Sequence, residues 1–241
     1  MNLPFYIARR YLFSKKKHNA INIISGISVC GVALATLALV CTLSVFNGFQ
    51  DMVASFFTAF DPELKISIRE GKVFDGQDER IQAIRALPEV AVFTETLEEN
   101  AMVQYKDRQT MAVIKGVEDN FEDLTSIDSI LYGAGDFLLH DSIVDYAVMG
   151  IELVSTLGTG IQFVDPLQIY TPKRNAKVNM ANPSASFNME YLFSPGTVFV
   201  VNQQKYDSRY ILTSLDFVRR MLDYTTEVSA IELKLNPGVS T

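Results

Sequence analysis

An uncharged run of 32 residues near the N-terminus, residues 19–50, constrains this chain more than any other feature. About 20 apolar residues cross the ~30 Å hydrocarbon core of a bilayer as a helix, so this run is long enough to span a membrane. A secretory signal peptide has an apolar region of only about 7–15 residues and a cleavage site of small residues. Bulky Phe46 and Phe49 stand at the far end of this run. The run therefore predicts an uncleaved transmembrane helix.

Charge is distributed unequally on the two sides of this run. Five cations and no acid precede residue 51, and the rest of the chain carries 16 cations and 28 acids, a net charge of −12. Because Lys and Arg near a span stay on the cytoplasmic side, the N-terminus is predicted to lie inside and residues 62–241 outside. An acidic outer domain argues against nucleic acid as a partner, since phosphate binding requires a basic surface.

The segment before the span is predicted to form a cytoplasmic region, residues 1–20. Pro4 and a mixture of aromatic residues and arginines over residues 4–13 indicate a short amphipathic helix at the membrane surface. A basic turn at residues 14–19 follows it. The alternative is a disordered basic tail.

Small residues recur along one side of the predicted span at steps of three and four. Bulky residues continue the same register, so both sets lie on one face of a single helix. Small residues allow close approach of a second helix in a membrane, although they are also common in spans without such contacts. The predicted packing face consists of Ser28, Gly31, Ala35, Ala38, Thr42, Phe46 and Phe49. The helix with its protruding stalk is assigned to residues 21–60 and is expected to stop at Asp61-Pro62.

Beyond the stalk, alternating and helical patterns indicate an α+β domain. The predicted strands are 64–69, 90–94, 101–105, 110–117, 167–170, 187–193, 197–201, 210–212 and 229–235, and the predicted helices are 78–87, 147–157 and 215–223. Helices near both ends enclose a strand-rich middle. This order predicts an α/β subdomain split between residues 61–94 and 202–241, with a mostly-β subdomain, residues 95–201, inserted into it.

Motifs for catalysis, for metal binding and for cofactor binding are not found in the sequence. There is no phosphate-binding loop, dinucleotide fingerprint, zinc-protease motif or nucleophile elbow, so no enzyme activity and no cofactor are expected. His140 stands alone beside Asp141, as a surface residue does. Cys30 and Cys41 both lie within the span, so the outer domain has no disulfide. The acidic residues Glu95, Glu98 and Glu99 are expected to form a solvated patch.

One long segment, residues 171–186, differs from the rest of the acidic domain. It holds two prolines, three asparagines and three cations without an acid. Loops longer than about 12–15 residues inside a compact domain are usually functional or disordered. Its positive charge favours encounter with an acidic partner, and the alternative is a merely mobile surface loop.

Several of these segments resemble the permease subunits of lipoprotein-releasing ABC transporters, the LolC/LolE family within the MacB/FtsX-like permease group. The strongest element is the sequence LSVFNGF at residues 43–49, and residues 24–28, 61–66 and 150–153 also fit. The resemblance implies a MacB-like periplasmic core, with one porter-like and one sabre-like subdomain. It also implies a bacterial inner-membrane protein whose residues 62–241 are periplasmic. Three more spans would follow residue 241.

The resemblance implies a function and a set of partners. The chain would be a permease subunit that extracts lipoproteins from the inner membrane and hands them to a periplasmic carrier. Motion driven by ATP would pass through its first helix from a cytoplasmic ABC ATPase. A second permease, identical or paralogous, the lipoprotein substrate and membrane lipid complete the partners. The alternative is a MacB/FtsX-like mechanotransmission permease, or a single-span adaptor or sensor.

The same resemblance assigns a carrier-binding hook to the long basic loop. Cations of the loop would speed encounter with the carrier, and apolar side chains would hold the complex. The hook residues are Pro172, Lys173, Arg174, Lys177, Val178, Met180, Pro183 and Phe187.

Overall fold

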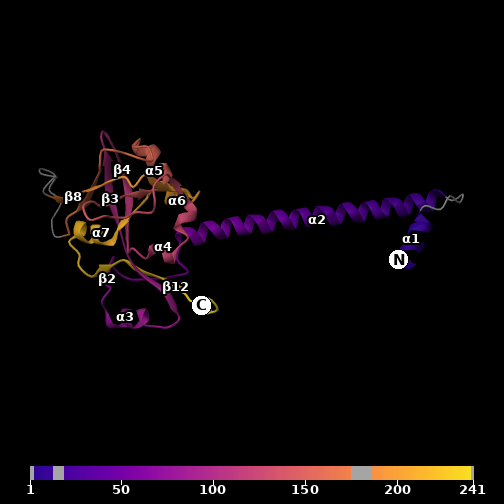
Figure 1. The fold of residues 1–241 in the computed structure, drawn as a ribbon, viewed down its shortest axis with the longest axis horizontal. Coiled ribbons are helices and arrows are strands. Elements are labelled where there is room, and N and C mark those ends of the chain that lie inside the picture. Colours follow the sequence, from indigo (N-terminus) through magenta and orange to yellow (C-terminus); the bar gives the residue numbers. More distant parts are fainter. Residues whose placement is uncertain (1–2, 13–18, 175–185, 240–241) are drawn as a thin grey trace. The chain divides into compact units, whose positions relative to one another are not determined.

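The computed structural model describes residues 3–12, 19–174 and 186–239 of the chain. The chain divides into two compact units, Met1–Ala54 and Ser55–Thr241. The first contains α1 (Leu3–Leu12) and most of α2 (Asn19–Phe60), and the second contains the sheets and the other described helices (Figure 1). The predicted α+β class, a long apolar helix followed by a domain of mixed sheets, is confirmed.

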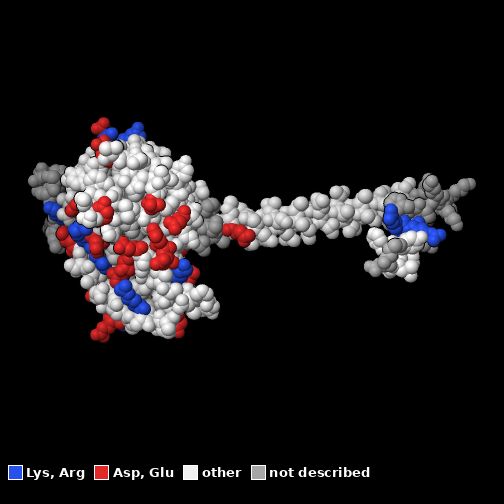
Figure 2. Space-filling view, viewed as in Figure 1, with Lys and Arg blue, Asp and Glu red and all other residues white. Residues whose placement is uncertain are grey.

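The helix α2 is continuous over 42 residues and ends immediately before Asp61 and Pro62, as predicted. Its stretch Ile23–Val53 has a mean hydropathy of 2.4, and by length and composition it can cross a membrane. No charged side chain occurs along it up to residue 50 (Figure 2). The hydroxyls of Ser28 and Thr42 donate to carbonyl oxygens four residues earlier, at 3.0 and 2.8 Å. The helix thus satisfies these polar groups itself, as a lipid environment requires.

The helix α1 confirms that the N-terminal segment is helical. Arg9 and Arg10 lie in its last turn, and exposed apolar side chains such as Leu3 and Phe5 precede them. This mixture suits a helix at a membrane surface. Its location at the cytoplasmic leaflet stays a prediction. Residues 13–18, which include most of the predicted basic turn, lie outside the described residues.

The second unit is built on a mixed sheet, in which the described residues contribute eight strands. Its main path runs β1-β12-β3-β4-β10-β6, and β7 and β8 branch from β3. The pair of β10 with β4 is parallel, and the other described pairs of this sheet are antiparallel. The strands are β1 (Leu64–Ser67), β3 (Val90–Tyr105), β4 (Arg108–Val117), β6 (Val148–Met149), β7 (Leu167–Pro172), β8 (Phe187–Leu192), β10 (Tyr210–Ser214) and β12 (Ala230–Leu235).

The strand β3 is central because it holds two partners in succession along one edge. Its first half pairs with β12, and Met102–Gln104 pair with β7, while β4 occupies the other edge. The prediction of separate strands at 90–94 and 101–105 is wrong, since one strand of 16 residues covers both. The expected subdomain boundary between residues 94 and 95 falls inside β3. The division into two subdomains stays a prediction.

Short helices and two small sheets complete the second unit. The helices are α3 (Glu79–Arg85), α4 (Phe121–Leu124), the 3-10 helix η1 (Ile127–Ile130), α5 (Ile151–Leu157), α6 (Gln204–Asp207) and α7 (Leu215–Leu222). The small sheets pair β2 (Phe74–Asp75) with β11 (Glu227–Val228), and β5 (Leu131–Gly133) with β9 (Thr197–Phe199).

The two largest of three hydrophobic cores among the described residues lie on opposite faces of the main sheet, because successive residues of a strand point to opposite sides. Ala112 and Ile114 of β4 belong to the larger core, which α5 and α7 cover. Val117 of β4 belongs to the second core, together with α4, η1 and Phe60. We call the side of this second core the anchor face of the sheet.

The predicted helix 147–157 is wrong in its first part. Val148–Met149 form strand β6, and α5 begins only at Ile151. Gly150 separates the two elements, and its N–H donates to the carbonyl oxygen of Tyr210 at 3.1 Å. The backbone of Asp207 lies so close to Gly150 that a Cβ would collide with it. This close approach of two backbones interrupts the helical pattern, and the sequence pattern alone does not reveal it.

Replacing Gly116 by alanine should lower the free energy of unfolding of the second unit by about 1–3 kcal/mol, because overpacking forces helix and strand apart. A Cβ at this position would lie 2.8 Å from Cγ2 of Val218 and 3.1 Å from Cα of Leu215 in α7. Denaturant unfolding followed by circular dichroism measures the loss. Gln109→Ala, at an exposed position of the same strand, is the control. Equal stability of the two variants would contradict the close contact.

Candidate functional site: the anchor of the first helix

The last residue of α2, Phe60, is a core residue of the second unit. Its side chain is 2% exposed. Its ring centroid lies 5.2 Å from that of Phe199, 4.4 Å from that of Tyr206 and 5.6 Å from that of Tyr210. Aromatic pairs at such separations contribute about 0.5–1.5 kcal/mol each beyond the area they bury. The helix therefore ends inside a packed aromatic cluster rather than in a loop.

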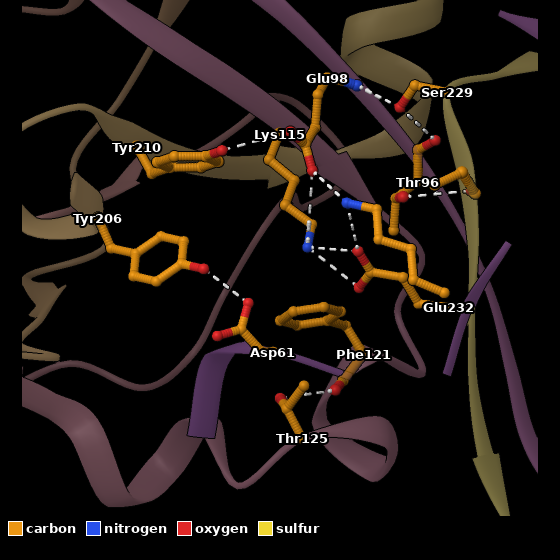
Figure 3. Close-up of polar contacts among 12 residues, drawn as sticks. Asp61, Thr96, Glu98, Lys115, Phe121, Thr125, Tyr206, Tyr210, Ser229 and Glu232 are labelled. Atoms are coloured by element: carbon orange, nitrogen blue, oxygen red, sulfur yellow. Dashed lines mark hydrogen bonds and ion pairs between the residues drawn. The ribbon is translucent and has the colours of Figure 1, made fainter. Parts of the chain in front are cut away.

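A hydrogen bond fixes the residue that follows. The Tyr206 hydroxyl donates to Oδ1 of Asp61 at 2.6 Å (Figure 3). Burial raises the pKa of Tyr206, and the bond to the Asp61 carboxylate raises it further, so the phenol remains a proton donor. Tyr206 thus holds the helix end in two ways, by packing on Phe60 and by bonding Asp61.

A buried ion pair lies beside the Phe60 ring. The Lys115 ammonium donates to both carboxylate oxygens of Glu232, at 2.7 and 3.0 Å (Figure 3). Lys115 is 2% exposed and Glu232 is fully buried. The ammonium also lies 5.5 Å from the ring centroid of Phe60 and 5.2 Å from that of Phe121. Both distances allow cation–π attraction, which is stronger in a desolvated place.

Two further charges extend this pair into a network. Lys65 lies 3.2 Å from Glu98 and 3.5 Å from Glu232, and Glu98 lies 4.0 Å from Lys115. Burial disfavours the charged form of Lys65, but Glu98 and Glu232 outweigh that effect and raise the pKa of Lys65. The two positive charges of the lysines therefore balance the two negative charges of the carboxylates. The four side chains come from four strands, β1, β3, β4 and β12.

This arrangement is suited to mechanical coupling of the helix end to the sheet rather than to catalysis. Buried charges are costly unless they remain paired, so the network resists displacement of the strands that carry it. Moving Phe60 would take its ring away from the Lys115 ammonium and loosen the aromatic cluster. The described residues include no group of three or more His, Cys, Asp or Glu side chains placed to hold a metal ion.

The expectation that Glu95, Glu98 and Glu99 form a solvated acidic patch is wrong. Glu98 belongs to the network beside Phe60. Glu95 is buried and pairs with Arg219 of α7 at 2.6 Å. Glu99 pairs with Lys72 at 2.9 Å. Each of the three carboxylates forms an ion pair with a cation from a distant segment. Because the carboxylates are paired, β3 runs through these positions as one strand.

The residues expected to form the carrier hook are only partly described. Lys177, Val178, Met180 and Pro183 lie outside the described residues. Pro172 and Phe187 are cross-strand neighbours at the paired ends of β7 and β8, and the Lys173 N–H donates to the Ser186 carbonyl at 2.9 Å. The structure therefore places both ends of this loop at one edge of the sheet, while the role of the hook stays a prediction.

Arg174 of the expected hook contacts other residues of the second unit. Its guanidinium lies 3.2 Å from Glu227 and 4.7 Å from the ring centroid of Tyr224. Backbone N–H groups, first that of Thr225, lower the pKa of Glu227 to about 2, and Arg174 contributes to this shift. Arg174 and Lys173 line a groove of about 280 Å³. Because Arg174 pairs with Glu227, its substitution would also disturb a contact within the domain. Lys173 is therefore the better of the two cations for a test of carrier binding.

The residues of the predicted packing face are exposed along α2 in the isolated chain. They are Ser28, Gly31, Ala35, Ala38, Thr42, Phe46 and Phe49. Their contact with a second helix stays a prediction. His140 is exposed, as expected of a surface residue, and lies 2.9 Å from Asp119. That carboxylate raises the pKa of His140.

Sequence reasoning did not identify Lys115, Glu232 or Tyr206 as functional residues. One signal was present: Lys115 and Glu232 are single charges inside otherwise apolar strand patterns, MAVIKGV and AIEL. A charge at such a position is almost never buried without a partner. Nothing local, however, indicates that two residues 117 positions apart form one pair.

A family model described as the MacB-like periplasmic core domain matches residues 25–241. The chain belongs to this family. It therefore carries the periplasmic domain type of MacB/FtsX-like ABC permeases, preceded by an apolar helix long enough to span a membrane. These features describe a membrane-anchored extracytoplasmic domain. The predicted membership of the MacB-like group is confirmed.

Similarity to the lipoprotein-releasing permeases is distant and partial. The lipoprotein-releasing system transmembrane protein LolC of Xylella fastidiosa (strain 9a5c) is 30% identical over 125 residues, which are 52% of this chain and 30% of that protein. The corresponding LolE of Haemophilus influenzae is 27% identical over 130 residues, which are 52% of this chain and 31% of that protein. The chain thus spans about a third of the length of these relatives.

Solved structures that are similar to this chain are more distant in sequence. The extracellular domain of the noncanonic ABC-type transporter YknZ from Gram-positive bacteria has a TM-score of 0.45 and 8% identity, covering 72% of this chain and 83% of that chain. The periplasmic region of MacB from Actinobacillus actinomycetemcomitans has a TM-score of 0.41 and 9% identity, covering 70% of this chain and 75% of that chain.

Replacing Lys115 by methionine should lower the free energy of unfolding of the second unit by about 3–5 kcal/mol, because Glu232 keeps a buried charge without its closest partner. The double variant Lys115→Met with Glu232→Leu should lose much less, since it removes both charges and leaves Lys65 paired with Glu98. A double-mutant cycle in denaturant unfolding measures the coupling. Additive losses would contradict the account of a coupled pair.

Proposed function

We propose that this chain is a permease subunit of an ABC transporter that extracts lipoproteins from the inner membrane and passes them to a periplasmic carrier. The chain itself does mechanical work, and ATP hydrolysis belongs to a separate cytoplasmic ATPase. A second permease, identical or paralogous, completes the membrane part. Motion from the ATPase reaches the periplasmic domain through α2.

The anchor at Phe60 is the observation that carries this proposal. A mechanical permease requires that the end of its first helix be fixed to the domain it moves. Phe60 and Asp61 meet this requirement through aromatic packing and the 2.6 Å hydrogen bond from Tyr206. The buried pair of Lys115 and Glu232 connects the same point to β4 and β12. A displacement at Phe60 is therefore transmitted to the central strands of the sheet.

Similarity to LolC and LolE supports lipoproteins as the cargo. Both relatives are described as transmembrane proteins of a lipoprotein-releasing system, and their similarity covers about half of this chain. The expected hook would hand the lipoprotein to a soluble carrier. Pro172, Lys173, Arg174 and Phe187 lie at its described ends.

A second candidate is a mechanotransmission permease of the MacB/FtsX type that does not release lipoproteins. The family model favours it, because that model covers residues 25–241, whereas the LolC similarity covers 125 residues. Both candidates use the same anchor. They differ in what the periplasmic domain contacts outside the membrane.

Reconstitution tests the cargo. Proteoliposomes that contain the full-length chain, its second permease, the cytoplasmic ATPase and a lipoprotein are supplied with ATP and soluble carrier. The proposal predicts that lipoprotein appears in the soluble fraction in complex with the carrier, and only with ATP. Normal ATP hydrolysis without lipoprotein release would contradict it and favour the mechanotransmission permease.

Lys173→Glu should slow association of the carrier in a salt-dependent way, because charges at the edge of an interface act mainly on encounter. The rate constant of association is measured by surface plasmon resonance at two salt concentrations. Lys72→Glu is the matched control, since Lys72 lines the same groove but lies outside the hook. Equal effects of the two variants, or an effect on dissociation alone, would contradict the role of the hook.

A further inference from the structure

The ends of β7 and β8 form a two-stranded extension of the main sheet. The pairing of β7 with β3 covers residues 168–170, whereas the pairing of β7 with β8 continues to Pro172, opposite Phe187. The N–H of Lys173 then donates to the Ser186 carbonyl at 2.9 Å. A two-stranded ribbon is at most marginally stable by itself in water. Contacts from outside the two strands are therefore needed to hold this extension, which carries both ends of the long basic loop.

The C-terminal end of α7 contacts the β8 side of this extension (Figure 1). The Asn188 side-chain amide donates to the carbonyl oxygen of Met221 at 2.8 Å, and it lies 3.4 Å from Oδ2 of Asp223. The last carbonyl groups of a helix have no partner within that helix, so this amide satisfies one of them. Asp223 ends α7 in the left-handed conformation, with a φ of 56°. Asn188 therefore joins β8 to the point where α7 ends.

The residue that follows the end of α7 contacts the β7 side of the extension. The Arg174 guanidinium lies 4.7 Å from the ring centroid of Tyr224, within the range of cation–π attraction. The Tyr224 N–H donates to the carbonyl oxygen of Arg219 at 2.9 Å, so Tyr224 is attached to the last turn of α7. Tyr224 and Leu222 also line the same groove as Lys173. Both sides of the extension thus contact one short stretch of chain at the end of α7.

The helix α7 is itself fixed to two strands of the anchor, on the face opposite the anchor face. Glu98 of β3 belongs to the anchor network, and Glu95 points by alternation to the other face. There Glu95, which is 2% exposed, pairs with Arg219 of α7 at 2.6 Å. Gly116 of β4 allows Val218 of α7 to approach the strand closely. Because breaking a buried ion pair is costly, α7 is expected to follow β3 and β4 when these strands move.

We propose that α7 positions the two ends of the long basic loop relative to the anchor, and that Asn188 and Tyr224 are the positioning residues. Coupling between distant sites is carried by packed side chains and rigid elements, and α7 provides both. A movement of the anchor strands would reach the loop ends through this helix, in addition to the short pairing of β3 with β7. This inference deepens the proposed function and rests on it for the role of the loop in carrier binding.

The distance between two spin labels tests this positioning in the full-length chain. Cys30→Ala and Cys41→Ala remove the two cysteines of this sequence. Labels are then attached at Lys173→Cys, at the end of β7, and at Gln109→Cys, an exposed position of β4. Electron paramagnetic resonance gives the distribution of the distance between the labels. A loop end that is held by α7 should give a single narrow distribution.

Asn188→Ala should widen this distribution about twofold, because the extension loses its link to α7 and a ribbon without support is marginally stable. Asn236→Ala is the matched control, since the Asn236 amide donates to the Pro88 carbonyl at 2.7 Å, outside the extension. Tyr224→Ala should also widen the distribution. Tyr224→Phe should not, because it keeps the ring that Arg174 contacts. Asn188→Ala changes only a half-buried amide, so the test holds even where Tyr224→Ala does not fold.

Unchanged distributions in Asn188→Ala and Tyr224→Ala would overturn the proposal and leave the pairing of β3 with β7 as the support of the loop ends. Equal widening in Asn236→Ala would overturn it as well. The same variants without labels are measured for association of the carrier, which should slow wherever the distribution widens. Unchanged association in a widened variant would overturn the part of α7 in carrier binding. Absence of carrier binding by the unaltered chain would instead contradict the proposed function, and the distance result would still decide whether α7 holds the loop ends.

Discussion

The buried pair of Lys115 and Glu232 is the interaction on which the rest of the second unit depends. It joins β4 to β12, lies against the rings of Phe60 and Phe121, and is completed by Lys65 and Glu98. A buried ion pair adds little net stability compared with apolar packing, but it strongly penalises arrangements in which either partner is alone. It therefore fixes where the end of α2 sits against the sheet.

The anchor lies on one side of the long strand β3. Glu98 belongs to the anchor through its ion pair with Lys65, and β3 continues from it to Tyr105. In the proposed permease, motion that enters at Phe60 reaches the far end of the sheet through a single rigid strand. A long continuous β3 serves this purpose better than two separate strands would.

The features that are local in sequence could be predicted, and those that depend on distant partners could not. The length of α2 and its end before Pro62 follow from an unbroken helical pattern and a residue that cannot continue it. The continuity of β3 could not be predicted, because Glu95 is neutralised by Arg219, 124 residues later. The roles of Lys115 and Tyr206 could not be predicted for the same reason. The helix predicted over residues 147–157 is wrong in its first part because the distant backbone of Asp207 approaches Gly150.

The proposed mechanism depends on the coupling of the first helix to the domain through Phe60. It is tested by measuring how much ATP is hydrolysed for each lipoprotein released in proteoliposomes that contain the complete transporter. Phe60→Ala should leave hydrolysis near the unaltered rate while release falls. Phe217→Ala, which removes an equally buried ring from the other core, should leave the ratio unchanged in the fraction that folds. An unchanged ratio for Phe60→Ala, or the same rise for both variants, would contradict the account.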